Sequence, residues 1–135
     1  MHTHAQPRTR EAFLEEVVEG SHVKAIADFY HDDATMQENL GVPRRGKETL
    51  MAHEQAALDR IQRMHTHPVQ AFLVDGDHVA IRWTFDRIDK AGTVRRLEEV
   101  ALQRWRGDRI AEERFVYDTA SAWRLVGPDG NVVEG

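Results

Sequence analysis

The sequence predicts an α+β fold in which three helices precede a meander of long antiparallel strands. Apolar residues recur at helical spacing in the first half of the 135-residue chain and at alternate positions in the second half. Short turns containing glycine and aspartate ("DGD", "DKAG" and "GD") separate the strand-like segments, as expected of hairpins. Because strands twist, a sheet of this length must curl, and its concave face is expected to close over the helices.

Three segments of the first half predict helices. From Thr9 to Gly20 the apolar residues follow a helical period, and Gly20 ends the segment. Ser21 suits the N-cap of a second helix over residues 22–31. The stretch "KETLMAHEQAALDRIQRM", residues 47–64, predicts the third helix because its apolar residues share one face.

One short strand and four longer ones complete the predicted fold. "DDATMQENL" follows the second helix as a turn and short strand. The longer strands are "PVQAFLV", "DHVAIRWTFDRI", "TVRRLEEVALQRWR" and "RIAEERFVYD". No linker or shift in composition divides the chain, so a single domain over residues 9–135 is expected, after a loose leader over residues 1–8.

Composition excludes several classes of function. The net charge of −5 argues against a general nucleic-acid-binding protein, which presents a basic face. No apolar run approaches the roughly 20 residues that a membrane span needs. The N-terminal residues lack the apolar core of a signal peptide, so a cytoplasmic location is expected. The chain contains no cysteine, which removes disulfides and thiolate metal sites.

One carboxylate stands in an unusual context. Alternation puts Glu38 on the same side of a strand as Met36 and Leu40, and this apolar side is expected to face the interior. A carboxylate there must find a partner, hold a proton or take part in chemistry. Glu38 is therefore either a group that takes part in chemistry or one half of a salt bridge. The cations near enough in sequence for such a bridge are Arg44, Arg45 and Lys47.

Alternation also defines one face of the strand "DHVAIRWTFDRI". Ile81, Trp83 and Phe85 are its apolar members, whereas the residues between them are polar. These three side chains are expected to point toward the helices.

The order of the elements, with "FYHDDATMQENLG", the helix entry "RRGKETL" and the ending "WRGDRIAEERFVYD", resembles the nuclear transport factor 2-like superfamily. Within that superfamily the chain looks most like SnoaL-like proteins and ketosteroid isomerases, over residues 9–123. The resemblance implies a cystatin-like cone, in which a curved antiparallel sheet wraps around three N-terminal helices and a pocket opens between them. The superfamily contains enzymes and proteins without enzymatic activity, so the fold does not by itself define the function.

The resemblance implies that alternate residues of the long strands line the pocket. It places Glu99, Ala101, Gln103 and Trp105 inward on one strand, and Glu113, Phe115 and Tyr117 inward on the last. Such an aromatic and mostly apolar cavity suits a hydrophobic small molecule, although the same aromatic residues can simply pack a core. The predicted substrate-binding residues are Met36, His53, Glu54, Ile81, Trp83, Phe85, Ala101, Glu113 and Phe115.

Glu38 matches the position of the general base in the ketosteroid isomerase pattern. The two donors of the isomerase oxyanion hole, however, fall on Leu14 and at or near Ala101, which cannot donate from their side chains. Steroid isomerisation is therefore not expected. The Asp–Arg–Asp arrangement of limonene epoxide hydrolase has no counterpart either, because its positions are occupied by Phe85, Trp83 and Phe115.

Two functions from different classes remain open. The first is a cofactor-independent isomerase, cyclase, dehydratase or hydrolase acting on a hydrophobic carbonyl compound, with Glu38 as base and Tyr117 or Gln103 as donor to the oxyanion. The second is a non-catalytic ligand-binding or association module with the same fold. No cofactor and no metal are expected.

Four further polar residues are weighed and assigned structural roles. His53 is an alternative acid–base partner for Glu38, but a single helix histidine is more often structural. Asp118 resembles an active-site acid of some SnoaL-like cyclases and equally suits the cap of a short helical turn, which we favour. His65 and His67 share one side of a strand but lack a third metal ligand.

The resemblance also implies pairing of two copies through the outer face of the sheet. That face is expected to present Val100 and Leu102 among Arg96, Glu98 and Arg104, a mixture that suits a homodimer interface.

Overall fold

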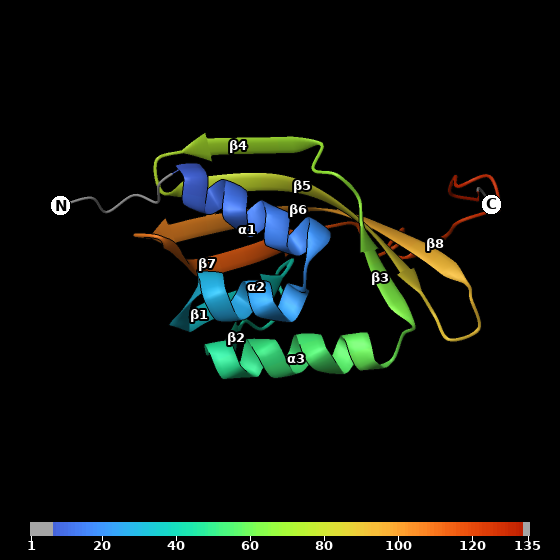
Figure 1. Cartoon of the computed structure of the whole chain (residues 1–135), viewed down its shortest axis with the longest axis horizontal. Helices are drawn as coiled ribbons and strands as arrows, with labels where there is room; N and C mark the ends of the chain where they lie inside the picture. Colours follow the sequence, from blue (N-terminus) through green and yellow to red (C-terminus); the bar gives the residue numbers. More distant parts are fainter. Residues whose placement is uncertain (1–6, 134–135) are drawn as a thin grey trace.

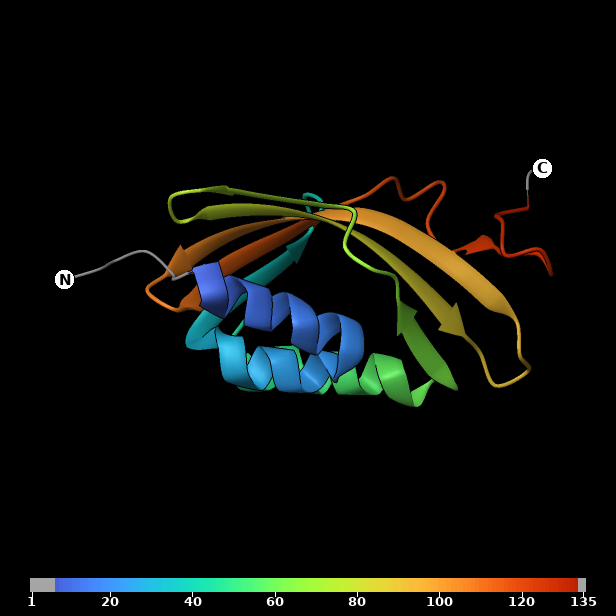
Figure 2. The same cartoon turned by 45° about the horizontal axis from the view of Figure 1, so that its top comes forward.

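The computed structural model describes residues 7–133 and confirms the α+β fold (Figure 1). Three helices lie against one side of an eight-stranded sheet, which arches over them (Figure 2). The helices are α1 (Pro7–Glu19), α2 (His22–Phe29) and α3 (Lys47–Asp59). The strands are β1 (Tyr30–Glu38), β2 (Arg44–Arg45), β3 (Arg63–Thr66), β4 (Ala71–Asp75), β5 (His78–Ile88), β6 (Val94–Arg106), β7 (Arg109–Val116) and β8 (Arg124–Leu125).

The N-terminal helices follow the sequence signals closely. α1 begins at Pro7, two residues before the predicted start, and proline is well suited to the first turn because its missing N–H has no partner there. The predicted leader otherwise falls on residues 1–6, which lie outside the described residues. Ser21 caps α2 as predicted, since its hydroxyl accepts a hydrogen bond of 3.1 Å from the Lys24 backbone N–H.

The sheet has the order β2-β1-β7-β6-β5-β3, with β4 paired to β5 and β8 paired to β6. The prediction of a purely antiparallel sheet is wrong at one place, because β1 and β7 run parallel, with Met36 opposite Glu113. The two strands are far apart in sequence, so no hairpin forces them to run in opposite directions. Every other strand pairing within residues 7–133 is antiparallel.

The end of the third helix was predicted wrongly. α3 ends at Asp59 instead of residue 64, and Arg63–Thr66 form β3, which pairs with the edge of β5. Met64 lies opposite Arg87, and Thr66 opposite Phe85. Sheet pairing with a distant strand outweighs the local helical period here. β2 and β8 were not predicted, since two residues are too few to show alternation.

The core lies between α1, α2 and the concave face of the sheet. Trp83 and Trp105 are among its most completely buried side chains. The Phe13 ring of α1 packs edge-on against four aromatic rings of the core: Phe29, Tyr30, Trp83 and Trp105. This aromatic cluster fixes α1 against the sheet and closes the narrow end of the cone. Among residues 7–133, no helix is long and apolar enough to span a membrane.

Candidate functional site

A cavity of about 320 Å³ opens between the concave face of the sheet and the helices. Its walls come from all three helices and from strands β1, β2, β3, β5, β6 and β7. Of the predicted binding residues, Met36, Glu38, His53, Glu54, Trp83, Phe85, Glu113 and Phe115 line it. Ile81, Ala101 and Gln103 point inward and are buried but form the layer behind the wall. The cavity volume is in the range of small-molecule sites.

Glu38 lies at the rim of the cavity, and the expectation that it is buried is wrong. Its side chain is 45% exposed, because β1 ends at Glu38 and the chain turns through Asn39 with φ at 50°. Leu40, whose apolar character suggested an interior face, is 86% exposed. Glu38 accepts a hydrogen bond of 2.9 Å from Arg44 and one of 3.3 Å from the Tyr117 hydroxyl. Glu38 therefore lies at the cavity rim and also forms a salt bridge with Arg44.

Glu113 lies at the centre of a buried hydrogen-bond network. One carboxylate oxygen accepts a short hydrogen bond from the Tyr30 hydroxyl, and the other accepts one of 2.6 Å from the Gln103 amide. The Gln103 carbonyl in turn accepts the indole N–H of Trp105 at 2.9 Å. Burial raises the pKa of Glu113 to about 7, although these two hydrogen bonds oppose the rise. The Gln103 amide is thus engaged at both ends and has no group turned to a ligand.

Glu99 on the concave face differs from Glu38 and Glu113, whose carboxylates accept hydrogen bonds from the protein. The residue is only 8% exposed and lines the cavity, yet its carboxyl group has no hydrogen-bond or salt-bridge partner among the described residues. Burial, followed by the charges of Glu113, Glu38 and Glu54, raises its pKa to about 8. At neutral pH the group is mostly a neutral carboxylic acid, which can donate its proton in a hydrogen bond.

The sequence predicts that the Glu99 side chain points inward but assigns it no function. The family resemblance already placed its side chain inward, among the alternate residues of β6. What the alternation cannot reveal is whether an inward carboxyl finds a partner. Gln103 reaches Glu113 across the strand pair, where the two residues are directly opposite each other. Glu99 lies opposite Trp83 instead, and no hydrogen bond joins these two side chains.

His22 forms a second polar group on the cavity wall that the sequence did not reveal. Its Nδ1 lies 3.2 Å from a Glu54 oxygen, and its Nε2 lies 2.8 Å from the Thr66 hydroxyl. The ring also packs edge-on against Phe85 at 5.3 Å. Thr66 is buried and does not reach the cavity wall, so its hydroxyl is not available to a ligand. His22 therefore has both ring nitrogens satisfied by the protein.

The other candidate residues have structural contacts. Asp118 accepts hydrogen bonds of 3.0 Å from the Ala120 backbone and the Ser121 hydroxyl, which is the capping arrangement in a turn. His67 donates toward Asp86, which also accepts from Arg96 at 2.7 Å. Within residues 7–133, no group of three or more His, Cys, Asp or Glu side chains is placed to hold a metal ion.

Comparisons with known proteins agree with this geometry. The family model described as a SnoaL-like domain matches residues 11–113. No curated protein matches the chain. A protein of Catenulispora acidiphila with a ketosteroid isomerase-like fold, solved in complex with trimethylamine, is 21% identical, with a TM-score of 0.71 over 87% of this chain and 90% of that one.

Two further solved structures illustrate the range of related proteins. A putative SnoaL-like polyketide cyclase of Mesorhizobium loti is 28% identical, with a TM-score of 0.68 over 82% of this chain and 97% of that one. TerC, co-crystallised with polyporic acid, is 16% identical, with a TM-score of 0.69 over 84% of this chain and 91% of that one. Since the family model spans most of the chain and these structures share its fold, the protein belongs to the SnoaL-like domain family of the nuclear transport factor 2-like superfamily.

Proposed function

We propose that the protein is a cofactor-independent enzyme that enolises a hydrophobic carbonyl compound bound in the cavity. The observation that carries the proposal is Glu99, a carboxyl group on the cavity wall that is more than nine-tenths buried and has no partner among the described residues. A buried polar group without a partner is costly, so a function that uses it is the simplest reason for its presence.

Glu99 is proposed to act as the hydrogen-bond donor to the substrate carbonyl. A carboxylic acid that stays neutral near pH 7 can stabilise the negative charge that develops on that oxygen. The sequence predicts this role for Tyr117 or Gln103. The Gln103 amide already donates to Glu113 and its carbonyl accepts from Trp105, and the Tyr117 hydroxyl donates to Glu38. Glu113 is not the donor either, because both of its oxygens accept hydrogen bonds from the protein.

Glu38 is proposed to accept the proton from the carbon next to the carbonyl. The C–H bond breaks, its electrons form the enolate, and the proton moves to a carboxylate oxygen of Glu38. Arg44 and the Tyr117 hydroxyl hold Glu38 at the cavity rim. The charge of Glu38 also contributes to the raised pKa of Glu99, so the two groups interact across the same cavity. Isomerases, cyclases and dehydratases share this step.

A ligand-binding module without catalysis is the second candidate. It is favoured by the salt bridge between Glu38 and Arg44, in which the guanidinium already occupies one carboxylate oxygen. In that case the neutral Glu99 carboxyl recognises a carbonyl oxygen without any transfer of a proton.

An exchange experiment with an apolar ketone separates these functions. With 2-acetylnaphthalene in D₂O near neutral pH, the protein is expected to catalyse the replacement of the methyl protons by deuterium, followed by NMR. Glu99→Gln is expected to slow this exchange by about 100-fold, the typical effect of removing one oxyanion donor. Glu98→Gln is the matched control, since Glu98 is the exposed neighbour of Glu99 on the outer face.

Two outcomes would contradict catalysis. Saturable binding of the ketone with exchange at the background rate would leave only the binding function. Exchange that is equally fast in the parent protein and in Glu99→Gln would remove Glu99 from the mechanism.

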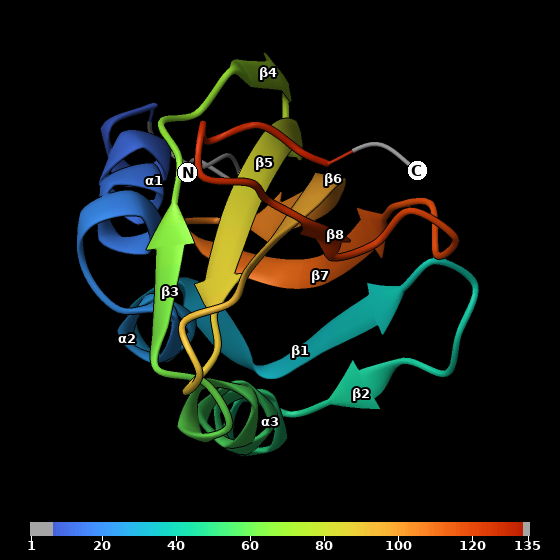
Figure 3. The same ribbon diagram turned by 90° about the vertical axis from the view of Figure 1, so that its right-hand side faces the viewer.

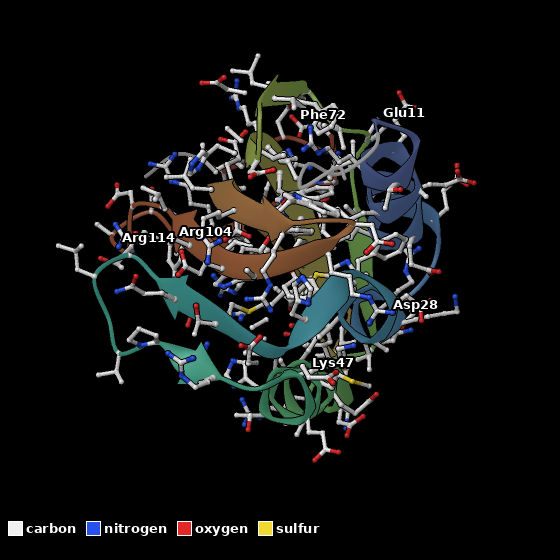
Figure 4. All side chains as sticks on the ribbon, turned by 90° about the vertical axis from the view of Figure 1, so that its left-hand side faces the viewer. Glu11, Asp28, Lys47, Phe72, Arg104 and Arg114 are labelled. Carbon is white, nitrogen blue, oxygen red and sulfur yellow. The ribbon has the colours of Figure 1, made fainter. Side chains whose placement is uncertain are left out.

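We also propose a homodimer through the outer face of the sheet. Val100, Leu102 and Val116 are exposed there, and Leu73 extends the patch on β4. Arg104 and Arg114 lie on the side of the sheet opposite the helices and frame this apolar strip with charge (Figure 4). Sedimentation at micromolar concentration is expected to give the mass of two chains, and Leu102→Glu is expected to give the mass of one. A parent protein that sediments as a monomer would refute the proposed dimer.

A further inference from the structure

The open end of the concave face carries two arginines directly opposite each other. Arg87 on β5 pairs with Arg95 on β6, and alternation puts both on the same face as Trp83 and Glu99. Like charges in this position repel each other and destabilise a sheet. Burial, together with the charge of Arg95, lowers the pKa of the Arg87 guanidinium. Figure 3 views the molecule from this end, where the end of α3, β3 and the β5–β6 hairpin meet.

Arg87 forms no salt bridge and donates no side-chain hydrogen bond among the described residues. Its guanidinium lies over the Trp123 ring, 4.6 Å from the ring centre, and no side chain or backbone group accepts a hydrogen bond from it. The charge of Asp89 attracts the guanidinium, but the Asp89 carboxylate accepts its hydrogen bonds from the backbone of its own turn. A guanidinium offers five N–H donors in a planar fork, and here they remain available to a ligand.

Arg60 adds a second available cation to the same end of the cavity. It lies just beyond the end of α3 and, like Arg87, lines the cavity. Arg60 is exposed, and its side chain has no salt bridge within residues 7–133. The third arginine of the cavity wall, Arg44, is already paired with Glu38. Two of the three arginines that line the cavity therefore have no salt bridge among the described residues.

The register of β5 and β6 sets the distance between this end and Glu99. Trp83 faces Glu99, and Arg87 lies four residues further along β5, so the two positions are separated by about 13 Å at the usual rise of a strand. The wall between them is apolar, because Phe85 and Leu97 face each other there and both line the cavity. The cavity thus has a hydrogen-bond donor, an apolar middle and an unpaired cation in series.

We propose, building on the function above, that the natural ligand is an elongated apolar carbonyl compound with a carboxylate at its outer end. The carbonyl lies at Glu99, the apolar body contacts Phe85 and Leu97, and the carboxylate binds the guanidinium of Arg87 with support from Arg60. A carboxylate matches the planar fork of an arginine with two parallel hydrogen bonds. The anion also compensates the repulsion between Arg87 and Arg95.

The competing explanation is that Arg87 and Arg95 only anchor the C-terminal segment. Arg87 stacks on the Trp123 ring, and Arg95 donates to the Trp123 carbonyl at 3.4 Å. Such an anchor makes no distinction between charged and neutral ligands. The two explanations therefore differ in what they predict for a matched pair of probes.

The test compares 6-acetyl-2-naphthoate with its methyl ester, which have the same body and the same ketone. Binding is measured by quenching of tryptophan fluorescence near pH 6.5, with calorimetry as a second method. The acid is expected to bind about tenfold more tightly than the ester, as one charge-assisted hydrogen-bonded pair allows. Arg87→Gln, alone or with Arg60→Gln, is expected to reduce the affinity for the acid to that for the ester. Arg82→Gln is the matched control, because Arg82 lies on the outer face of the same strand.

Equal affinity of the parent protein for acid and ester would overturn the inference, and so would a preference for the acid that persists in the double variant. A loss of affinity for both probes in Arg87→Gln would identify the anchor explanation as the correct one. The function proposed for Glu99 is tested separately, by deuterium exchange of the ester in the parent and in Glu99→Gln. Preference for the acid without any dependence of exchange on Glu99 would leave the carboxylate site in place and remove the proposed reaction.

Discussion

The free energy of unfolding is expected to fall by several kcal/mol as the pH rises from about 5 to about 9. Most soluble proteins gain or keep stability over the lower part of this range, so the direction is distinctive. It follows from Glu99 and Glu113, whose pKa values in the folded protein are about 8 and about 7. Both lie above the value of an exposed glutamate, 4.5.

The sign follows from proton binding. Between pH 4.5 and pH 8 the folded protein holds a proton on Glu99 that the unfolded chain has already released. The free energy of unfolding therefore falls with rising pH across this window. The decrease that Glu99 alone can cause is at most about 5 kcal/mol. Asp86 has the opposite effect at lower pH. Burial would raise the pKa of its carboxyl group, but hydrogen bonds donated by Arg96 and His67 lower this pKa overall. Stability is then lost as the pH falls through the lowered pKa.

Urea unfolding at a series of pH values provides the measurement. Glu99→Gln removes the ionisable group and is expected to reduce the slope between pH 5 and pH 9, so that the variant is more stable than the parent at the alkaline end. Glu98→Gln is again the control, and its slope is expected to match that of the parent. Equal stability of the parent protein at the two ends of the range would mean that neither carboxyl group is held neutral by burial.

Trp105→Ala is expected to destabilise the fold by about 4 kcal/mol, the usual cost of truncating a large buried aromatic side chain. Trp105 is 1% exposed, its ring packs against Phe13 at 5.9 Å, and the buried Arg10 guanidinium lies over it at 5.9 Å. Its indole N–H also donates to Gln103, so the substitution leaves a buried carbonyl oxygen without a partner. The free energy of unfolding of a domain of this size is only about 5–15 kcal/mol, so such a loss is a large fraction of it.

Trp105→Phe separates the two contributions. It keeps an aromatic ring against Phe13 but removes the donor to Gln103, and a smaller loss of about 2 kcal/mol is expected. The measurement is chemical unfolding followed by circular dichroism. A loss below 1 kcal/mol in Trp105→Ala would show that the closed end of the cone is not fixed by this residue.

The helical spacing of apolar residues in the first half of the chain and their alternation in the second half were sufficient to predict most of the fold. Helical spacing and the Ser21 cap defined α1 and α2, and alternation correctly placed Trp83 and Phe85 on the concave face. The family resemblance did the same for Glu99. These features depend on neighbours in sequence, which the sequence itself displays. The parallel pairing of β1 with β7 and the change from helix to strand at β3 depend on distant strands, and local patterns carry no information on them.

The fold class, the family resemblance and most of the inward-pointing side chains therefore follow from the sequence alone, whereas the interior placement of Glu38 does not hold. Only the tertiary structure decided which inward polar groups satisfy one another. Glu113 meets Tyr30 and Gln103 from other strands, Glu38 is drawn to Arg44 at the rim, and Glu99 meets no partner among the described residues. The physical reason is that alternation fixes the direction of a side chain, whereas a hydrogen bond depends on the register between strands and on the depth at which each strand ends. The proposed donor is thus Glu99 instead of Tyr117 or Gln103, and the family resemblance had already placed Glu99 inward.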